Sequence, residues 1–338
     1  APGALRRSNA SEISAGASGE VTILLRYRPP YDWPAMLSYL QARAIPGIEE
    51  VSNNGYARTI EINGARGTVA VRTADGNALR ATVRFPKLSA LPAIIARLRR
   101  AFDLAADPDA IGAHLAEDRT LAPLIAARPG LRVPGAWDGF ELAVRAVLGQ
   151  QISVKAATDL AGKLVAAYGE PLDAPNTGNS RLTCTFPRPE RMAGVDLASL
   201  GMPRTRAAAL SSLAAAVTAD PEIFGAGRNL GEAVVKLRNL TGVGEWTAQY
   251  IAMRELREPG AFPAADIGLM HALADEDGKR PSPSELLARA EHWRPWRAYA
   301  AQHLWASLAQ AKSGSFSANC PASGNVRRYN GQRKPGNL

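Results

Sequence analysis

Apolar and polar residues follow two different spacings along this chain of 338 residues. Within 21–103, apolar side chains recur at every second position in several short stretches, most clearly at 56–62 and 67–72. A period of two is typical of strands with one exposed face. The segments 33–44 and 88–102 have helical spacing instead. The pattern predicts a small α+β unit with an antiparallel sheet, in which 21–25 and 81–85 are further strands.

Beyond residue 103 the chain is rich in alanine and keeps helical spacing almost to its end. Ser153 is a predicted N-cap, because its hydroxyl can accept a hydrogen bond from an unpaired amide of the first helical turn. The expected fold is therefore mostly α with an N-terminal α+β domain. The predicted helices are 139–150, 154–168, 204–218, 231–239, 245–256, 283–293 and 296–311.

These spacings divide the chain into four predicted parts. Residues 1–17 are small and polar and are interpreted as a linker, 18–105 as the α+β domain, 106–312 as the helical region and 313–338 as a basic tail. The tail combines Gly, Ser, Asn and Pro without periodicity, which predicts disorder. Two roles remain open for it: a solvated extension, or an arm that attracts DNA without reading its sequence.

The charge balance favours an acidic partner. The chain carries a formal net charge of +9 and has a pI near 9.8, which suits nucleic acid. Much of this surplus lies in the tail, which from Lys312 onward contains lysine and arginine but no Asp or Glu. The remainder is only mildly basic, so charge alone is weak support for DNA binding.

The remaining composition narrows the class of protein. The two cysteines, Cys184 and Cys320, exclude a disulfide framework and a four-cysteine iron–sulfur loop, and they fit a reducing cytoplasm. No apolar run approaches the roughly 20 residues of a membrane span, and the N-terminus lacks the apolar core of a signal peptide. The four histidines have no metal-ligand spacing. We expect a cytoplasmic protein that needs no organic cofactor and no catalytic metal.

The most informative segment, 240–250, reads Leu-Thr-Gly-Val-Gly-Glu-Trp-Thr-Ala-Gln-Tyr. A Gly-Val-Gly turn between apolar helical segments is what a helix-hairpin-helix requires. Gly242 and Gly244 can adopt backbone angles closed to other residues, and they let a phosphate approach closely. The amides after the turn open the next helix, so unpaired N–H groups face an anion. Such a contact holds DNA without reading its sequence.

These residues resemble the helix-hairpin-helix base-excision glycosylases, and more narrowly the AlkA-type DNA-3-methyladenine glycosylase II group. The resemblance extends over roughly 20–310 and implies the glycosylase fold beside a small antiparallel-sheet (TBP-like) domain. Residues 1–7 resemble the end of an AraC-type helix-turn-helix domain, which precedes this glycosylase in some fused adaptive-response proteins; an unstructured start is the alternative. The segments that carry the glycosylase resemblance are 29–33, 128–135, 145–150, 240–254, 262–266 and 293–297.

The resemblance implies a catalytic role for Asp266. This residue lies 22 positions beyond Gly244, after a Pro-containing loop and before an apolar run. One carboxylate against the anomeric carbon can stabilise the positively charged sugar and orient the attacking water. The same residue type in this position is also a good helix N-cap, and both roles are compatible.

The resemblance also implies an aromatic base pocket. Trp246 and Tyr250 lie at i and i+4 on one helix face, a spacing that by itself fits a core stripe as well as a pocket wall. Trp305 matches a further pocket tryptophan, and Tyr39 matches an aromatic contributed by the small domain. A base alkylated on a ring nitrogen is cationic, so electron-rich ring faces attract it.

Two more features of the family have counterparts here. Strand-cutting members carry Gly-x-Gly-x-Lys-Thr-Ala, whereas this chain has Trp246 in place of the nucleophilic lysine, which implies a monofunctional enzyme. The loop with Gln151, Ile152 and Ser153 matches the segment that fills the gap left by a flipped nucleotide. The family often has leucine where this chain has Gln151, so Gln151 and Ile152 both remain candidates for the wedge.

The remaining expected DNA contacts come from the hairpin, through Gly242, Val243, Gly244 and Thr247, with a monovalent cation at the carbonyls of 240–242. We therefore expect a cytoplasmic, nucleoid-associated, monomeric glycosylase that removes alkylated bases from duplex DNA and leaves an abasic site. Two alternatives remain: a noncatalytic damage-sensing or regulatory DNA-binding protein, and a glycosylase for other damaged bases.

Overall fold

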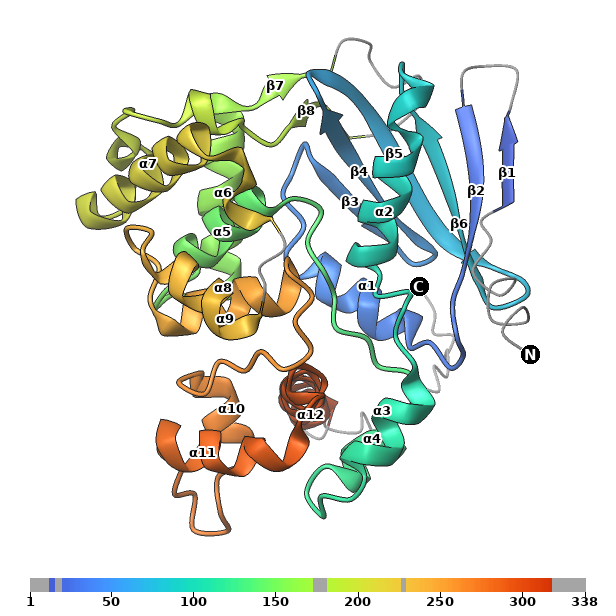
Figure 1. Ribbon diagram of the computed structural model, residues 1–338, viewed down its shortest axis with the longest axis vertical. Coiled ribbons are helices and arrows are strands. Elements are labelled where there is room, and N and C mark those ends of the chain that lie inside the picture. Colours follow the sequence, from blue (N-terminus) through green and yellow to red (C-terminus); the bar gives the residue numbers. More distant parts are fainter. Residues whose placement is uncertain (1–11, 16–19, 173–180, 226–228, 318–338) are drawn as a thin grey trace, which may run out of the picture.

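The computed structural model describes residues 12–15, 20–172, 181–225 and 229–317, and it contains an antiparallel sheet beside a group of helices (Figure 1). The sheet has the strand order β1-β2-β6-β5-β4-β3, in which every neighbouring pair is antiparallel. Its strands are β1 (Glu12–Ala15), β2 (Glu20–Arg26), β3 (Glu49–Ser52), β4 (Gly55–Ile62), β5 (Ala65–Ala74) and β6 (Ala78–Arg84).

One face of the sheet is covered by α1 (Trp33–Gln41) and α2 (Leu91–Ala101), which follows a short 3₁₀ turn at Leu88–Ala90. The alternating pattern of β2 identifies the covered face. Val21, Ile23 and Leu25 are buried and share a core with Met36 of α1 and Ile94 of α2. Burying every second side chain of a strand against helices is the reason that the alternating pattern predicts this layer.

The helical part surrounds α5 (Gly139–Leu148), nearly all of whose residues are buried. Its core joins α5 to α6, α7 and α9 and is continuous with the apolar side of α12. Within the described residues no helix is both long and apolar enough to cross a membrane. The other elements are α3 (Pro108–Leu115), α4 (Ala122–Ala127), α6 (Val154–Tyr168), the strand pair β7 (Glu170–Pro171) and β8 (Cys184–Thr185), α7 (Arg204–Ala219), α8 (Leu230–Arg238), α9 (Glu245–Arg254), α10 (Ile267–Ala272), α11 (Pro283–Ala290), α12 (Arg297–Ser317) and 3₁₀ turns at Pro189–Arg191, Leu197–Leu200, Pro221–Phe224 and Glu291–Trp293.

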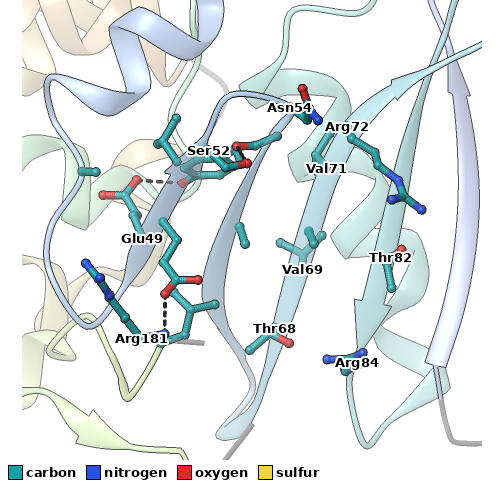
Figure 2. A pocket seen from close by; sticks show the side chains of 18 of the residues that line it. Glu49, Ser52, Asn54, Thr68, Val69, Val71, Arg72, Thr82, Arg84 and Arg181 are labelled. Atoms are coloured by element: carbon teal, nitrogen blue, oxygen red, sulfur yellow. Dashed lines mark hydrogen bonds between the residues drawn. The ribbon is translucent and has the colours of Figure 1, made fainter. Parts of the chain in front are cut away.

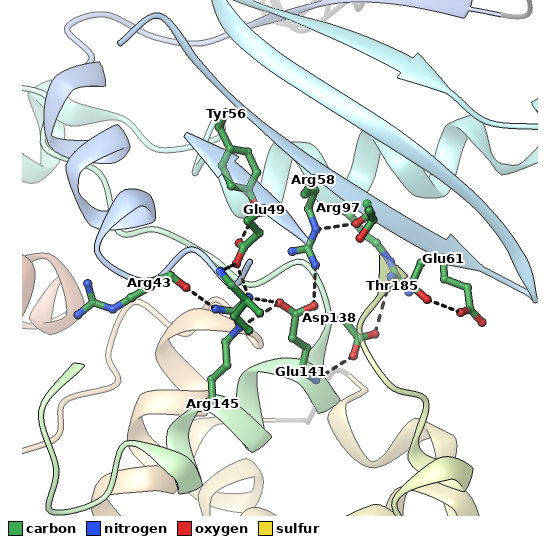
Figure 3. Close-up of polar contacts among 12 residues, drawn as sticks. Arg43, Glu49, Tyr56, Arg58, Glu61, Arg97, Asp138, Glu141, Arg145 and Thr185 are labelled. Carbon is green, nitrogen blue, oxygen red and sulfur yellow. Dashed lines mark hydrogen bonds and ion pairs between the residues drawn. The ribbon is translucent and has the colours of Figure 1, made fainter. Parts of the chain in front are cut away.

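A buried ion-pair network joins the sheet to α5 (Figure 3). Arg58 of β4 contacts Glu141 at 2.6 Å, while Arg145 contacts Glu141 at 2.7 Å and Glu49 of β3 at 2.5 Å. Burial raises the pKa of Glu141, but the two guanidinium groups outweigh this and hold it below its usual value. Removing one partner from such a network leaves an uncompensated buried charge. The network therefore fixes the position of the sheet on the helical part.

The predicted fold class and the main elements are confirmed, with two differences at the ends. Residues Glu12–Ala15, expected in a linker, form β1 and pair with β2. Edge pairing uses backbone groups and needs no apolar pattern, so composition does not reveal it. Helix α12 continues to Ser317, past the expected start of the tail, because extending an existing helix avoids the cost of nucleation. Residues 1–7 and 318–338 lie outside the described residues.

Glu255 connects α9 to α2 through a carboxylate that is almost fully buried. It lies 3.1 Å from Arg100, and its Oε2 has no hydrogen-bond partner among the described residues. Burial raises its pKa to about 7, which Arg100 only partly offsets. A raised pKa in the folded state favours the protonated form, so this group stabilises the fold below about pH 4.5 and the contribution is lost as the pH rises towards 7.

We predict that Glu255→Gln reduces the dependence of stability on pH between about 4.5 and 7. As the pH rises, the wild type should lose up to about 3 kcal/mol of unfolding free energy, which is the cost of a pKa shift of this size. The variant should not show this loss, because its neutral amide has no proton to release. The check is the urea-unfolding free energy of both proteins at pH 5 and pH 8. Equal pH dependence in the two proteins would contradict the assignment of this titration to Glu255.

Candidate active site

A cavity of about 590 Å³ lies where the small domain meets the helices. It is lined by residues of α1, α5, α6, α9, α10 and α12, among them all four aromatic residues expected from the sequence, and by Asp266. A larger groove of about 1010 Å³ follows the open side of the sheet (Figure 2). The two carboxylates in this groove already have partners within the protein: Glu49 accepts a hydrogen bond from the Tyr56 hydroxyl, and Glu50 accepts one from the Arg181 amide. The smaller cavity is therefore the better candidate for chemistry.

Three donors hold the Asp266 carboxylate at the wall of this cavity. Oδ2 accepts a hydrogen bond of 2.8 Å from the indole Nε1 of Trp246, and Oδ1 accepts one of 2.9 Å from the indole Nε1 of Trp305. Oδ1 also accepts the Leu269 amide at 2.9 Å, so Asp266 is the N-cap of α10, as predicted. Both oxygens are fixed by charge-assisted bonds from three different parts of the chain.

The space beside this carboxylate depends on a glycine. A Cβ atom at Gly268 would lie 2.9 Å from Asp266 Oδ1 and 3.4 Å from the Trp305 ring. Any side chain at this position would therefore push the carboxylate or the indole away. Gly268 was not among the predicted site residues, since nothing in its spacing indicates which side chains it faces.

Aromatic rings form one wall of the cavity. Trp246 and Tyr250 stack with their centroids 5.1 Å apart and an angle of 10° between their planes. The Tyr39 hydroxyl of α1 lies 3.1 Å from the Tyr250 hydroxyl, which joins the small domain to α9. Burial raises the pKa of Tyr39 to about 12. The i, i+4 pair is thus a pocket wall in the structure, not a stripe buried in the core.

Sequence reasoning missed a cation in the same wall. Arg254 continues the face of Trp246 and Tyr250 at i+8, and its guanidinium carbon lies 4.7 Å from the Tyr39 ring centroid and 4.8 Å from that of Tyr250. Burial raises the pKa of Tyr250, but Arg254 and Arg43 outweigh it, and the net change is a lowering. The helical spacing could have revealed Arg254, whereas its burial could not be read from the sequence.

The hairpin joins α8 to α9 and shows different roles for its two glycines. Gly242 has φ of +83°, and a Cβ there would lie 2.5 Å from the Cβ of Ala209. Gly244 has an ordinary φ of −83° and is the N-cap of α9, and a Cβ there would meet nothing within 4 Å. Two uses were expected of both glycines, and the first, a backbone angle closed to other residues, holds for Gly242 but not for Gly244. The space beside Gly244, above the first amides of α9, is open, as the second use requires.

The other expected hairpin contacts are limited to the backbone. The side chains of Val243 and Thr247 are buried, and Thr247 Oγ1 accepts a 3.0 Å hydrogen bond from Gln150 Nε2. Of their amides only that of Thr247 can therefore face DNA, because the Val243 amide is already bonded within the turn. The Leu240 carbonyl accepts the Val243 amide and the Gly242 carbonyl accepts Gln150 Nε2, and a cation at these carbonyls stays a prediction.

The loop before α6 separates the two wedge candidates. Gln151 is exposed and has φ of +59°, which is uncommon for a residue with a side chain. Ile152 lines the cavity instead. Ser153 caps α6, since its Oγ accepts the Ala156 amide at 3.2 Å. A strained backbone angle such as that of Gln151 persists where neighbouring contacts enforce it. Here Arg206 donates a 2.5 Å hydrogen bond to the carbonyl of the preceding residue, Gln150.

Comparisons with known proteins agree with this geometry. Residues 22–138 match the model of the AlkA N-terminal domain, and residues 144–298 match the model of the HhH-GPD superfamily base excision DNA repair protein. The chain is 36% identical over 288 residues to DNA-3-methyladenine glycosylase 2 of Escherichia coli (strain K12), which covers 83% of this chain and 95% of the relative. The chain belongs to this helix-hairpin-helix glycosylase family.

A second relative and a solved structure are also similar to this chain. The chain is 39% identical over 309 residues to the "Probable bifunctional transcriptional activator/DNA repair enzyme AlkA" of Mycobacterium tuberculosis (strain CDC 1551 / Oshkosh). The match covers 91% of this chain but only 61% of the length of that relative. The solved 3-methyladenine DNA glycosylase of Archaeoglobus fulgidus has the same fold, with a TM-score of 0.73 at 20% identity, covering 83% of this chain and 96% of that one.

The two glycines give a test of the hairpin. We predict that Gly244→Ala weakens binding to damaged and undamaged duplexes alike, because the added methyl group occupies the space that a phosphate needs, and leaves the melting temperature nearly unchanged. Gly242→Ala is the matched comparison and should lower the melting temperature, since it clashes with Ala209. Fluorescence anisotropy and thermal unfolding measure the two effects. Unchanged DNA affinity in Gly244→Ala would exclude a phosphate contact at this turn.

Proposed function

We propose that this chain is a monofunctional DNA glycosylase that removes alkylated bases, such as 3-methyladenine and 7-methylguanine, from duplex DNA as a monomer. The observation that supports this most is the Asp266 carboxylate, held between two indole N–H groups at the wall of an aromatic cavity. The relatives named for 3-methyladenine excision support the same substrate class.

The proposed reaction breaks the bond between the anomeric carbon and the base nitrogen. The bonding electrons leave with the base, and a positive charge develops on the sugar. The fixed carboxylate of Asp266 stabilises this charge without reorganising, and it orients the water whose oxygen bonds to the anomeric carbon. The water proton passes to the carboxylate or to solvent. An alkylated base is already a good leaving group, so one carboxylate suffices.

Binding of the substrate requires the nucleotide to leave the duplex. In this proposal the first amides of α9, next to Gly244, hold a backbone phosphate, and the exposed Gln151 side chain fills the gap in the base stack. The flipped base then enters the cavity between Trp246 and Ile152. A solved 8-oxoguanine glycosylase/lyase of Clostridium acetobutylicum with the same fold is in complex with dsDNA, which supports this assignment of partner (TM-score 0.68, 16% identity, covering 90% of this chain and 98% of that one).

The main alternative is a noncatalytic protein that recognises damaged DNA. The hairpin would serve such a protein equally well, but the arrangement at Asp266 would be costly to maintain without chemistry. A carboxylate beside the aromatic wall contributes nothing to the grip on phosphates, whereas it has a direct use in stabilising a positively charged sugar. The structure therefore favours the enzyme.

We predict that Asp266→Asn abolishes most base release while leaving affinity for damaged duplex within a fewfold of the wild type. The amide keeps the shape but cannot supply the charge, and the loss of one such electrostatic contribution costs on the order of 10²–10³ in rate. Single-turnover release of 3-methyladenine is the measurement.

Asp275→Asn is the matched control, because the Asp275 carboxylate accepts the Lys279 amide in the loop after α10 and does not line the cavity. This variant should release base at the wild-type rate. Wild-type release by Asp266→Asn, or an equal loss in both variants, would contradict the role of Asp266.

We also predict that borohydride traps no covalent complex between this protein and methylated DNA. Trapping requires an amine that attacks the sugar, and the hairpin position of such an amine is occupied by Trp246. None of the lysines in the described part of the chain lines the cavity; Lys236 bonds the Glu222 carbonyl on the surface. The measurement is denaturing electrophoresis after borohydride treatment, with a strand-cutting glycosylase as positive control. Efficient trapping would show a lyase mechanism instead.

A further inference from the structure

The base cavity contains an amide side chain whose orientation is fixed by a neighbouring charge. Gln302 of α12 lines the cavity and is 8% exposed. Its Oε1 accepts a hydrogen bond of 3.3 Å from a terminal nitrogen of the Arg254 guanidinium. A guanidinium can only donate, so the end of the amide that faces Arg254 is the oxygen and not the nitrogen.

Arg254 is itself held in place, which keeps the amide in this orientation. Its side chain is 2% exposed and donates a 2.8 Å hydrogen bond to the Pro134 carbonyl. Its guanidinium carbon also lies over a third ring of the cavity, 5.5 Å from the centroid of Trp305. Turning the Gln302 amide over would place its NH₂ group against a donor and remove the acceptor from Arg254.

The amide nitrogen of Gln302 is left for a ligand. Nε2 carries two hydrogens, and neither has an acceptor among the described residues. Leaving an N–H group of a largely buried side chain without an acceptor is unfavourable, and a bound group with a lone pair removes this cost. The cavity-lining hydroxyl of Thr158 differs in this respect, because it already donates to the Val154 carbonyl of its own helix at 3.0 Å.

Gln302 and the Asp266 carboxylate belong to different levels of the cavity. Gln302 precedes Trp305 by three residues on α12, so their side chains share a face and lie one turn apart. Trp305 bonds Asp266, whereas Gln302 bonds Arg254. Helix α9 repeats this order, because Trp246 bonds Asp266 and Arg254 follows it by eight residues. A base whose sugar lies beside Asp266 therefore turns its remote edge towards Gln302.

We propose that Gln302 is a specificity-determining residue, whose Nε2 donates a hydrogen bond to an acceptor on the edge of the flipped base that is remote from the sugar. This role rests on the proposed function, since it requires a base to enter the cavity with its sugar beside Asp266. A purine is attached to the sugar through its five-membered ring, so its remote edge carries positions 1 and 6. The favoured class is 6-oxo purines, such as 7-methylguanine, whose carbonyl oxygen accepts this bond.

The aromatic wall and the amide then have separate tasks. The rings of Trp246 and Tyr250 can stack with any flat base, so they do not distinguish one edge from another. Gln302 distinguishes bases by one atom of that edge. A 6-amino purine such as 3-methyladenine has an amino group at position 6, which cannot accept this hydrogen bond. Its removal depends on stacking and on its weak glycosidic bond.

The test compares two duplexes that differ at position 6 of one purine. One contains hypoxanthine, with a carbonyl oxygen at this position, and the other contains unsubstituted purine, with a hydrogen. Both are 2′-fluoroarabino nucleotides, which resist cleavage, and affinities are measured by fluorescence anisotropy. Gln302→Leu removes both ends of the amide, whereas Gln302→Glu keeps an acceptor for Arg254 but has no N–H group. Each variant should lower the hypoxanthine-to-purine affinity ratio by about two- to tenfold, the range for one neutral hydrogen bond.

Thr158→Val is the matched control, because its hydroxyl lines the cavity but already has an acceptor. This variant should leave the affinity ratio within about twofold of the wild type, which is less than one hydrogen bond typically contributes. A merely structural role of Gln302 would lower both affinities together and leave the ratio unchanged, which would overturn the proposal. A lowered ratio in Gln302→Leu but not in Gln302→Glu would also overturn it, since the donor would then be irrelevant.

Catalysis is measured separately, as release of 7-methylguanine and 3-methyladenine from methylated duplex. Gln302→Leu should lower release of 7-methylguanine more than release of 3-methyladenine. Base release by the wild type with an unchanged affinity ratio in the variants means that the role of Gln302 is wrong and the proposed function stands. A lowered affinity ratio without base release by the wild type means that the amide reads the base as proposed, but that the protein is not the proposed enzyme.

Discussion

The arrangement of the site depends on one carboxylate that is held by two indole N–H groups. Asp266 belongs to the start of α10, Trp246 to α9 and Trp305 to α12, so the two hydrogen bonds exist only when these three helices pack as they do. The same contact orients both tryptophan rings towards the cavity. The buried network between Arg58 and Glu141 matters for the same reason, because it places the small domain so that Tyr39 reaches Tyr250.

The sequence was sufficient to predict the residues whose roles follow from local spacing. Trp246 and Tyr250 share a face because a helix repeats every 3.6 residues, and Asp266 was predicted as an N-cap from its place before an apolar run. Gly242 was predicted correctly as a turn glycine. Of the two reasons given for both glycines, Gly244 fits only the open approach, because a Gly-x-Gly pattern does not distinguish a backbone constraint from a need for open space.

What could not be predicted depends on contacts between distant residues. Nothing local shows that Arg254 is buried under three rings, that Trp305 donates to Asp266, or that Arg58 pairs with Glu141 across the domain boundary. The two wrong boundaries, at the linker and at the tail, have the same cause. β1 exists through pairing with β2, and the end of α12 extends a helix that is stabilised elsewhere. These contacts turn a recognisable motif into a pocket that is lined by aromatic rings, a carboxylate and a guanidinium.

The central claim is that this cavity breaks the glycosidic bond of an alkylated base and leaves the strand intact. Single-turnover incubation of the chain with a duplex containing one 7-methylguanine tests it most directly, with free base quantified and the strand resolved before and after alkali. The account predicts free base and an unbroken strand that breaks only in alkali. Tight binding without free base, or a broken strand before alkali is added, would contradict it.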